Sequence, residues 1–152
     1  MTSLTRSARS SRRGTLRRFF GLPAAERRVV VRCGVLLARA GVLARLLPIG
    51  RVMAGIDARA ARRTGARSVG ADRAVQLLEA TAARLRPRPR CLSTALAGYE
   101  LLRERGVAAR CVIGGRRGEP GFAAHAWLEA EGSIVLGDPV TAYQPIWAWP
   151  ER

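Results

Sequence analysis

The residue with the clearest chemical potential is Cys91, which stands at the start of a helical pattern. Pro87 and Pro89 restrict the chain just before it, and apolar residues recur at helical spacing from Leu92 onward. The amide groups of a helix N-terminus stabilise negative charge, and a nearby imidazolium does the same, so a cysteine placed here is favoured as a thiolate. The pattern therefore predicts a nucleophilic cysteine that transfers acyl groups through its sulfur.

His125 is the only histidine in the chain, so it is the only imidazole that could serve as the base. A single histidine on a strand is more often structural, and its role depends on its neighbours. Asp138 lies where the following strand ends and could orient the ring, while Glu129 and Glu131 are alternatives on the histidine's own strand. An aspartate before a proline is also typical of a turn. We predict a catalytic triad of Cys91, His125 and Asp138.

The other two cysteines, Cys33 and Cys111, are predicted to be packed thiols. Cys33 lies inside an amphipathic helix, and Cys111 lies inside a strand without an obvious activating base. Three cysteines without metal-ligand spacing indicate neither a disulfide framework nor a zinc site. We therefore expect a cytoplasmic protein that uses no metal and no cofactor.

Helical spacing in the first two thirds of the chain gives way to strand-like alternation after Gly106. We expect helices over 24–47, 51–63, 73–85 (capped by Asp72) and 91–105, with a linker over 64–70. We expect strands over 107–113, 122–130 and 133–136. A turn over 114–121 and a hairpin at Glu131–Gly132 should join these strands. Trp147 and Trp149 could line a substrate groove or cover the core. A helix followed by an antiparallel meander is an α+β pattern.

Positive charge is concentrated in the N-terminal part of the chain. Residues 1–90 hold 21 arginines and 4 acidic residues, a net charge of +17, while residues 91–152 have a net charge of −1. This predicts a disordered basic tail (1–18), a basic amphipathic helical region (19–70) and a catalytic domain (71–152). Arg32, Arg39 and Arg45 interrupt the apolar stretch, so we expect no membrane-spanning helix.

Four motifs resemble one known family when they are taken together. They are Cys91–Leu96 opening a helix, Gly106–Arg110 entering a strand, Phe122–Glu129 around the histidine, and Gly137–Pro139. They are similar to the transglutaminase-like leader peptidase of lasso-peptide biosynthesis, the B2 protein family. The N-terminal segment 19–48 also resembles that family, with less specificity.

The resemblance implies a transglutaminase-like, papain-like core, in which Cys91, His125 and Asp138 cleave the leader from a ribosomally made precursor peptide. It also implies two partners, a separate leader-binding protein and the macrolactam cyclase that acts next. The backbone N–H of Cys91 is a candidate oxyanion donor, and the sequence identifies no second one.

Two other functions fit parts of the sequence. The basic segment could bind nucleic acid through phosphates, although it has neither a zinc finger nor a recognisable helix-turn-helix. The same triad could instead pass the acyl group to an amine, because both reactions share the acyl-enzyme. We expect the basic segment to dock the leader-binding partner, with a membrane surface as the alternative.

Overall fold

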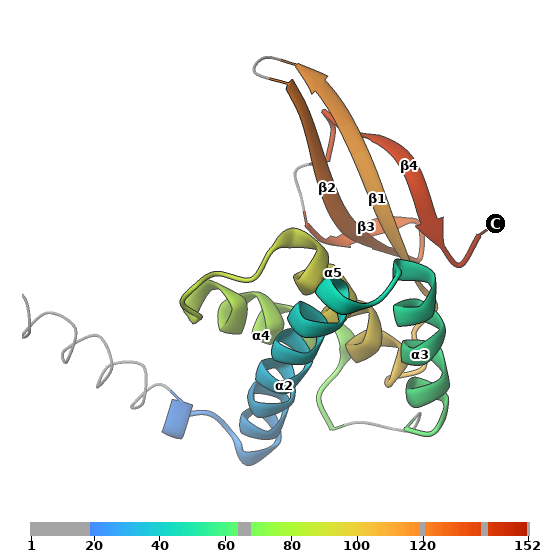
Figure 1. Ribbon diagram of the computed structural model, residues 1–152. Helices are drawn as coiled ribbons and strands as arrows, with labels where there is room; N and C mark the ends of the chain where they lie inside the picture. The colour runs from blue at the N-terminus through green and yellow to red at the C-terminus, as the bar shows by residue number, and fades with distance from the viewer. Residues whose placement is uncertain (1–18, 64–67, 119–120, 138–139, 152) are drawn as a thin grey trace, which may run out of the picture.

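The computed structural model describes residues 19–63, 68–118, 121–137 and 140–151 (Figure 1). The predicted tail over 1–18 and the predicted orienter Asp138 lie outside these residues. Helices α2 to α5 come first and a four-stranded sheet follows. The predicted α+β class, with a cysteine-bearing helix before an antiparallel sheet, is therefore confirmed.

Three of the four helices α2 to α5 begin directly after a proline or a glycine. The four are α2 (Ala24–Leu46), α3 (Ile49–Ala61), α4 (Ala71–Arg84) and α5 (Cys91–Arg103). Pro23 and Pro48 occupy the N-cap positions of α2 and α3, where a missing N–H costs nothing. The predicted cap of α4 was wrong: Gly70 is the N-cap, and Asp72 lies inside the first turn. Within the described residues, no helix has the length and apolar character needed to cross a bilayer.

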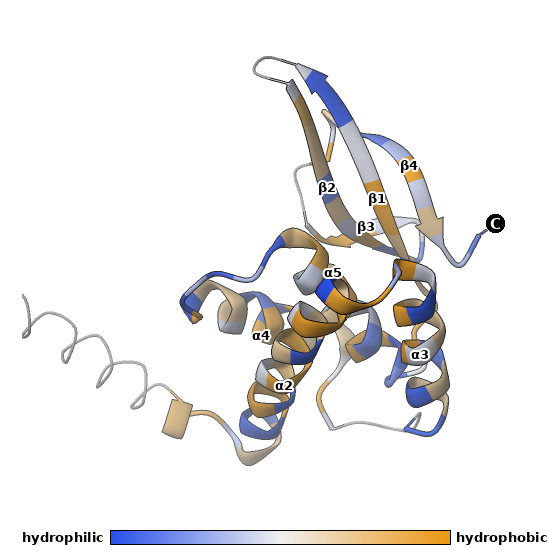
Figure 2. Cartoon of the chain, viewed as in Figure 1, coloured by the Kyte–Doolittle hydropathy of each residue, from blue (hydrophilic) through white to orange (hydrophobic). Residues whose placement is uncertain are grey.

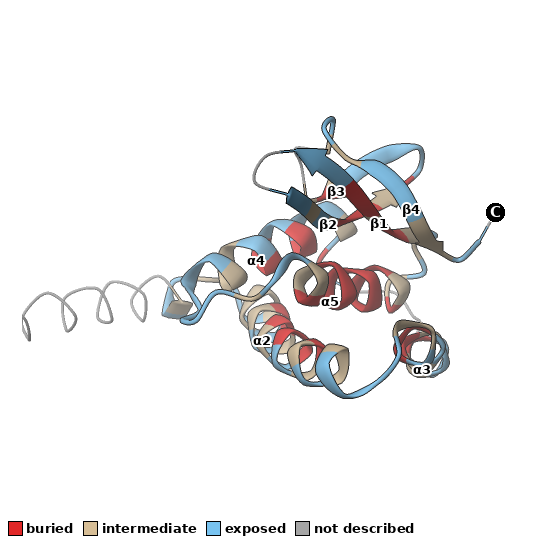
Figure 3. Cartoon of the chain, turned by 45° about the horizontal axis from the view of Figure 1, so that its top comes forward, coloured by how far each residue is buried: buried red, intermediate tan, exposed pale blue. Residues whose placement is uncertain are grey.

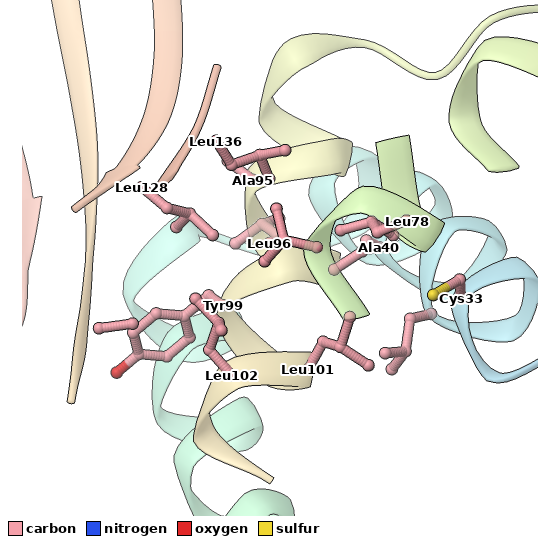
Figure 4. Packing of buried hydrophobic residues seen from close by; sticks show 14 of the residues in the cluster. Cys33, Ala40, Leu78, Ala95, Leu96, Tyr99, Leu101, Leu102, Leu128 and Leu136 are labelled. Carbon is pink, nitrogen blue, oxygen red and sulfur yellow. The ribbon is translucent and has the colours of Figure 1, made fainter. Parts of the chain in front are cut away.

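Helix α5 is the centre of the molecule. It packs against α2, α3 and α4 on one side and against β1 and β2 on the other. Figure 3 shows it buried along most of its length between the sheet and the other helices. Figure 4 shows its apolar side chains meeting those of the sheet and of α4. One continuous core thus includes residues on both sides of the predicted boundary at 70 and 71.

The sheet has the strand order β3-β2-β1-β4, and every neighbouring pair is antiparallel. Its strands are β1 (Ala109–Gly118), β2 (Gly121–Ala130), β3 (Ser133–Leu136) and β4 (Gln144–Trp149). The predicted hairpin at Glu131–Gly132 is confirmed, because both residues have positive φ angles, of 51° and 77°. Such a pair forms the tight turn that suits twisted strands.

The turn expected from Gly114 to Gly121 was wrong, because β1 continues to Gly118 and pairs with Gly121. Gly114 and Gly115 are in the strand for a packing reason. A Cβ at Gly114 would lie 2.6 Å from the Trp127 ring, and one at Gly115 would lie 2.7 Å from the Phe122 ring. These glycines make room for aromatic rings from β2 rather than a turn.

Buried charges join the helices. Glu100 and Glu104 of α5 are almost completely buried. Arg32 of α2 binds Glu104, and Arg39 of α2 and Arg59 of α3 bind Glu100. Part of the arginine excess of the N-terminal helices therefore neutralises carboxylates inside the fold.

Asp57 of α3 makes a second polar connection across the layers. It accepts hydrogen bonds from the Tyr99 hydroxyl of α5 at 2.9 Å and from the Trp149 indole of β4 at 2.8 Å. Trp147 and Trp149 pack partly buried against the core. The C-terminal tryptophans therefore cover the core.

Candidate active site

Cys91 is the first residue of α5, and it is exposed. The first backbone bond of the helix runs from the Thr94 N–H to the Arg90 carbonyl oxygen at 3.0 Å. The amide N–H groups of Cys91, Leu92 and Ser93 precede that bond and have no carbonyl partner within the helix. These N–H groups can stabilise a thiolate or an oxyanion beside it.

The other two thiols are unsuited to nucleophilic chemistry. Cys33 and Cys111 are buried, as predicted. Burial raises the pKa of Cys33 to about 11 and that of Cys111 to about 12. Both thiols therefore stay protonated at neutral pH, and Cys91 is the one accessible sulfur nucleophile among the three cysteines.

The His125 ring on β2 is held by a backbone carbonyl. Its Nε2 atom lies 2.6 Å from the carbonyl oxygen of Gly137. A carbonyl oxygen only accepts, so Nε2 must carry the proton, and the neutral ring leaves Nδ1 free to accept another. This is the tautomer that a general base needs.

Two aromatic rings flank His125. Trp127 stacks beside it at a centroid distance of 6.4 Å, and Tyr143 lies at 5.1 Å, tilted by 36°. The guanidinium of Arg116 sits 5.6 Å from the centre of the Tyr143 ring. Tyr143 was not predicted, because it lies in the connection before β4, which the alternation pattern did not reveal. A histidine between two aromatic rings has few ways to move.

Helix α5 and the ring of His125 both contact the end of β3. A Cβ at Gly98 of α5 would touch both Leu128 of β2 and Leu136 of β3. Figure 4 shows Leu136 beside Ala95, one helical turn after Cys91. Leu136 is followed by Gly137, the partner of His125. The end of β3 thus contacts α5 through Leu136 and holds His125 through Gly137.

The thiol and the ring are not bonded to each other in the described structure, where no hydrogen bond joins them. Leu128 faces α5, whereas His125 and Trp127 share the opposite face of β2 by strand alternation. Pairing of β2 with β3 begins only at Leu128, so the edge of β2 beside His125 is not covered by β3. No contact between His125 and Cys91 is described, and catalytic contacts are commonly longer in a free enzyme than in its substrate complex.

Of the alternative carboxylates, Glu129 is engaged elsewhere, and Glu131 lies in the turn of the hairpin. Glu129 accepts a hydrogen bond from the Trp127 indole at 3.0 Å and pairs with Arg110 at 3.4 Å. Glu131 occupies the positive-φ position of the hairpin. Asp138 directly follows the Gly137 carbonyl that holds the ring, although its own side chain lies outside the described residues. Its predicted role stays a prediction.

The sequence profile of the transglutaminase-like superfamily matches residues 28–148, which include most of α2, all of α3 to α5 and almost the whole sheet. The match includes Cys91 and His125. No curated protein and no solved structure matches the chain.

Proposed function

This chain belongs to the transglutaminase-like superfamily, whose members are generally cysteine-dependent enzymes, and we propose from this premise that it is a cysteine peptidase. Its substrate is a lasso-peptide precursor, from which it removes the leader peptide. The observation that carries the proposal is the exposed Cys91 at the N-terminus of the central helix. The chain's one imidazole, His125, is held on β2 by the Gly137 carbonyl.

Acylation begins when Nδ1 of His125 takes the proton of the Cys91 thiol. The thiolate attacks the scissile carbonyl carbon, a C–S bond forms, and the carbonyl electron pair moves to oxygen. The free N–H groups at the start of α5 are the candidate donors to this oxyanion. When the intermediate collapses, the C–N bond breaks, and the imidazolium gives its proton to the leaving amine.

Deacylation returns the enzyme to its starting state. His125 accepts a proton from water while the hydroxide adds to the thioester carbon. The C–S bond then breaks, and the thiolate is reprotonated from the imidazolium. One peptide and one water become one carboxylic acid and one amine. In this scheme the Asp138 carboxylate shares the Nε2–H donor of His125 with the Gly137 carbonyl and so helps to maintain the orientation of the ring.

The precursor is delivered by a separate leader-binding protein, and the released core passes to the macrolactam cyclase. The basis for both partners is the likeness of the motifs around Cys91 and His125 to the leader peptidases of lasso-peptide biosynthesis. The arginine-rich helices before α5 support a docking role for the N-terminal region, because many of their charges face solvent.

The proposal is tested by incubating a lasso-peptide precursor with the chain and its leader-binding partner, followed by mass spectrometry. We expect leader and core fragments with the native chain and with the surface control Glu79→Gln, and neither fragment with Cys91→Ala. Capture of an added primary amine in preference to water would make the chain an acyltransferase. Fragments that persist with Cys91→Ala would exclude Cys91 as the nucleophile.

A further inference from the structure

A groove of about 510 Å³ runs beside the nucleophile. One wall is the second half of α2, and the other is the connection between α4 and α5, over residues 85–90. Leu92 and Ser93, the two residues that follow Cys91, also line it. The groove is therefore lined by residues on both sides of Cys91 in the sequence, Arg90 before it and Leu92 and Ser93 after it.

The α2 wall of the groove is smooth because it contains two glycines. A Cβ at Gly34 would meet nothing within 4 Å, and one at Gly41 would meet only the Ser93 hydroxyl at 3.9 Å. Neither glycine is needed to pack against the rest of the protein. Both cost helix stability, about 0.5–1 kcal/mol each relative to alanine. The missing side chains leave space that another chain can occupy.

The charge of the groove has one sign. Arg45, Arg88 and Arg90 line it, and the described residues around it include no acidic side chain. All three arginines are exposed. None of them forms an ion pair within the part of the chain that the structure describes, unlike Arg32, Arg39 and Arg59, which bind the buried carboxylates of α5. Figure 2 shows the α4–α5 connection as a hydrophilic stretch beside the apolar helices.

We propose that this groove binds an acidic segment of the peptide substrate and leads it to Cys91. Carboxylates of the segment pair with Arg45, Arg88 and Arg90, and its apolar side chains pack over Gly41 and Leu92. Arginine forks bind carboxylates in a fixed geometry, and a wall without side chains allows a backbone to approach closely. The inference rests on the proposed peptidase function and adds the charge class of the substrate.

A peptide fits these features better than a nucleic acid does. Besides the arginines, the lining is largely aliphatic, from Leu37 and Val42 of α2 to Leu85 of the connection. The described lining contains no aromatic ring on which a base could stack. A peptide that carries both aliphatic side chains and carboxylates matches both the aliphatic lining and the arginines of the groove.

Binding can be measured without catalysis, on the Cys91→Ala chain, by fluorescence anisotropy. The probe is a labelled ten-residue peptide of alternating glutamate and leucine, compared with the same peptide carrying glutamine for glutamate. We expect the acidic peptide to bind about tenfold more tightly, and its affinity to fall between 0.1 and about 0.5 M salt. Equal affinity for the two peptides would overturn the proposal.

Two variants locate the binding, and each has a matched control. Gly41→Leu fills the groove and Arg88→Glu reverses its charge, and each should weaken binding of the acidic peptide about tenfold or more. Gly50→Leu on α3, where an added Cβ also meets nothing within 4 Å, and Arg62→Glu should leave binding unchanged. Circular dichroism checks that all four variants fold. Unchanged binding in Gly41→Leu would place the peptide elsewhere.

Single-stranded DNA serves as the competitor. An oligonucleotide that displaces the peptide and binds more tightly at physiological salt would assign the groove to phosphates and overturn the peptide proposal. Because the test uses a chain without the nucleophile, its result is independent of cleavage. If the Cys91→Ala chain binds the acidic peptide but the native chain cleaves no precursor, the peptidase function is refuted and the peptide-binding groove is not.

Discussion

The Nε2 atom of His125 lies 2.6 Å from the carbonyl oxygen of Gly137, the residue that precedes Asp138. This hydrogen bond fixes the ring as the Nε2–H tautomer and leaves Nδ1 as the proton acceptor. It also connects His125 to the end of β3. The chain contains no other histidine, so the ring can be observed without ambiguity.

The tautomer is the first prediction. Long-range ¹H–¹⁵N NMR spectra of the neutral ring in the untagged protein should show the proton on Nε2. A ring protonated on Nδ1 would mean that the Gly137 carbonyl does not hold it.

The second prediction concerns the effect of replacing Gly137. Its φ is +95°, and a Cβ there would lie 2.9–3.0 Å from atoms of Ala126 and Trp127, so Gly137→Ala must displace the carbonyl. We expect a loss of about 1–3 kcal/mol of stability, a mixed tautomer at His125 and at least tenfold slower cleavage. Gly132→Ala is the control, because its φ of +77° is similar but its Cβ would be free. Equal effects of the two substitutions would mean that backbone strain alone matters.

Thiol reactivity is the third prediction. Iodoacetamide at about pH 8 should modify the native chain once, at Cys91, because Cys33 and Cys111 are buried and their pKa values are raised. All three thiols should react in urea. Peptide mapping by mass spectrometry counts and locates the labels. Labelling of Cys111 in the native protein as fast as Cys91 would contradict the buried position.

The fourth prediction concerns alkaline pH. Unfolded thiols release their protons near pH 9, but Cys33 and Cys111 in the folded chain keep theirs until about pH 11 and 12. The folded state then holds more protons, so the free energy of unfolding falls as pH rises above 9. The expected slope is about 1.4 kcal/mol per pH unit for each thiol. Urea unfolding in reductant measures it, and Cys111→Ala should give a shallower slope; a flat profile to pH 10.5 would refute the effect.

The fifth prediction concerns the buried charges of α5. Glu100→Gln leaves Arg39 and Arg59 without a compensating carboxylate. Their guanidinium groups keep partial contact with water, so we expect a loss of about 2–3 kcal/mol rather than the full cost of a buried charge. The exposed Glu79→Gln should change stability little. Equal midpoints for the two variants in urea unfolding would show that the network adds no stability.

The sequence predicted the helices, and the position of Cys91 at a helix N-terminus, because both depend on local signals. Helices begin just after three prolines, which are Pro23, Pro48 and Pro89. After Cys91, apolar residues recur at helical spacing. The hairpin at Glu131–Gly132 likewise follows from two turn residues between alternating runs.

What the sequence could not predict depends on contacts between distant residues. Gly114 and Gly115 look like a turn, and only the rings of Trp127 and Phe122 explain why they form a strand. Glu100 was not predicted to be buried, because its arginine partners lie 41 and 61 residues away. Strand β4 was not predicted either, because it contains a proline and pairs with β1 through an irregular register.

The most direct test of Cys91 as the acyl acceptor is intact-mass analysis of the chain after rapid acid quench of a precursor reaction. A mass increase equal to the acyl fragment, localised to Cys91 by peptide mapping and lost in Cys91→Ala together with cleavage, is the predicted result. Cleavage by Cys91→Ala at the native rate, or an acyl group on another residue, would contradict it.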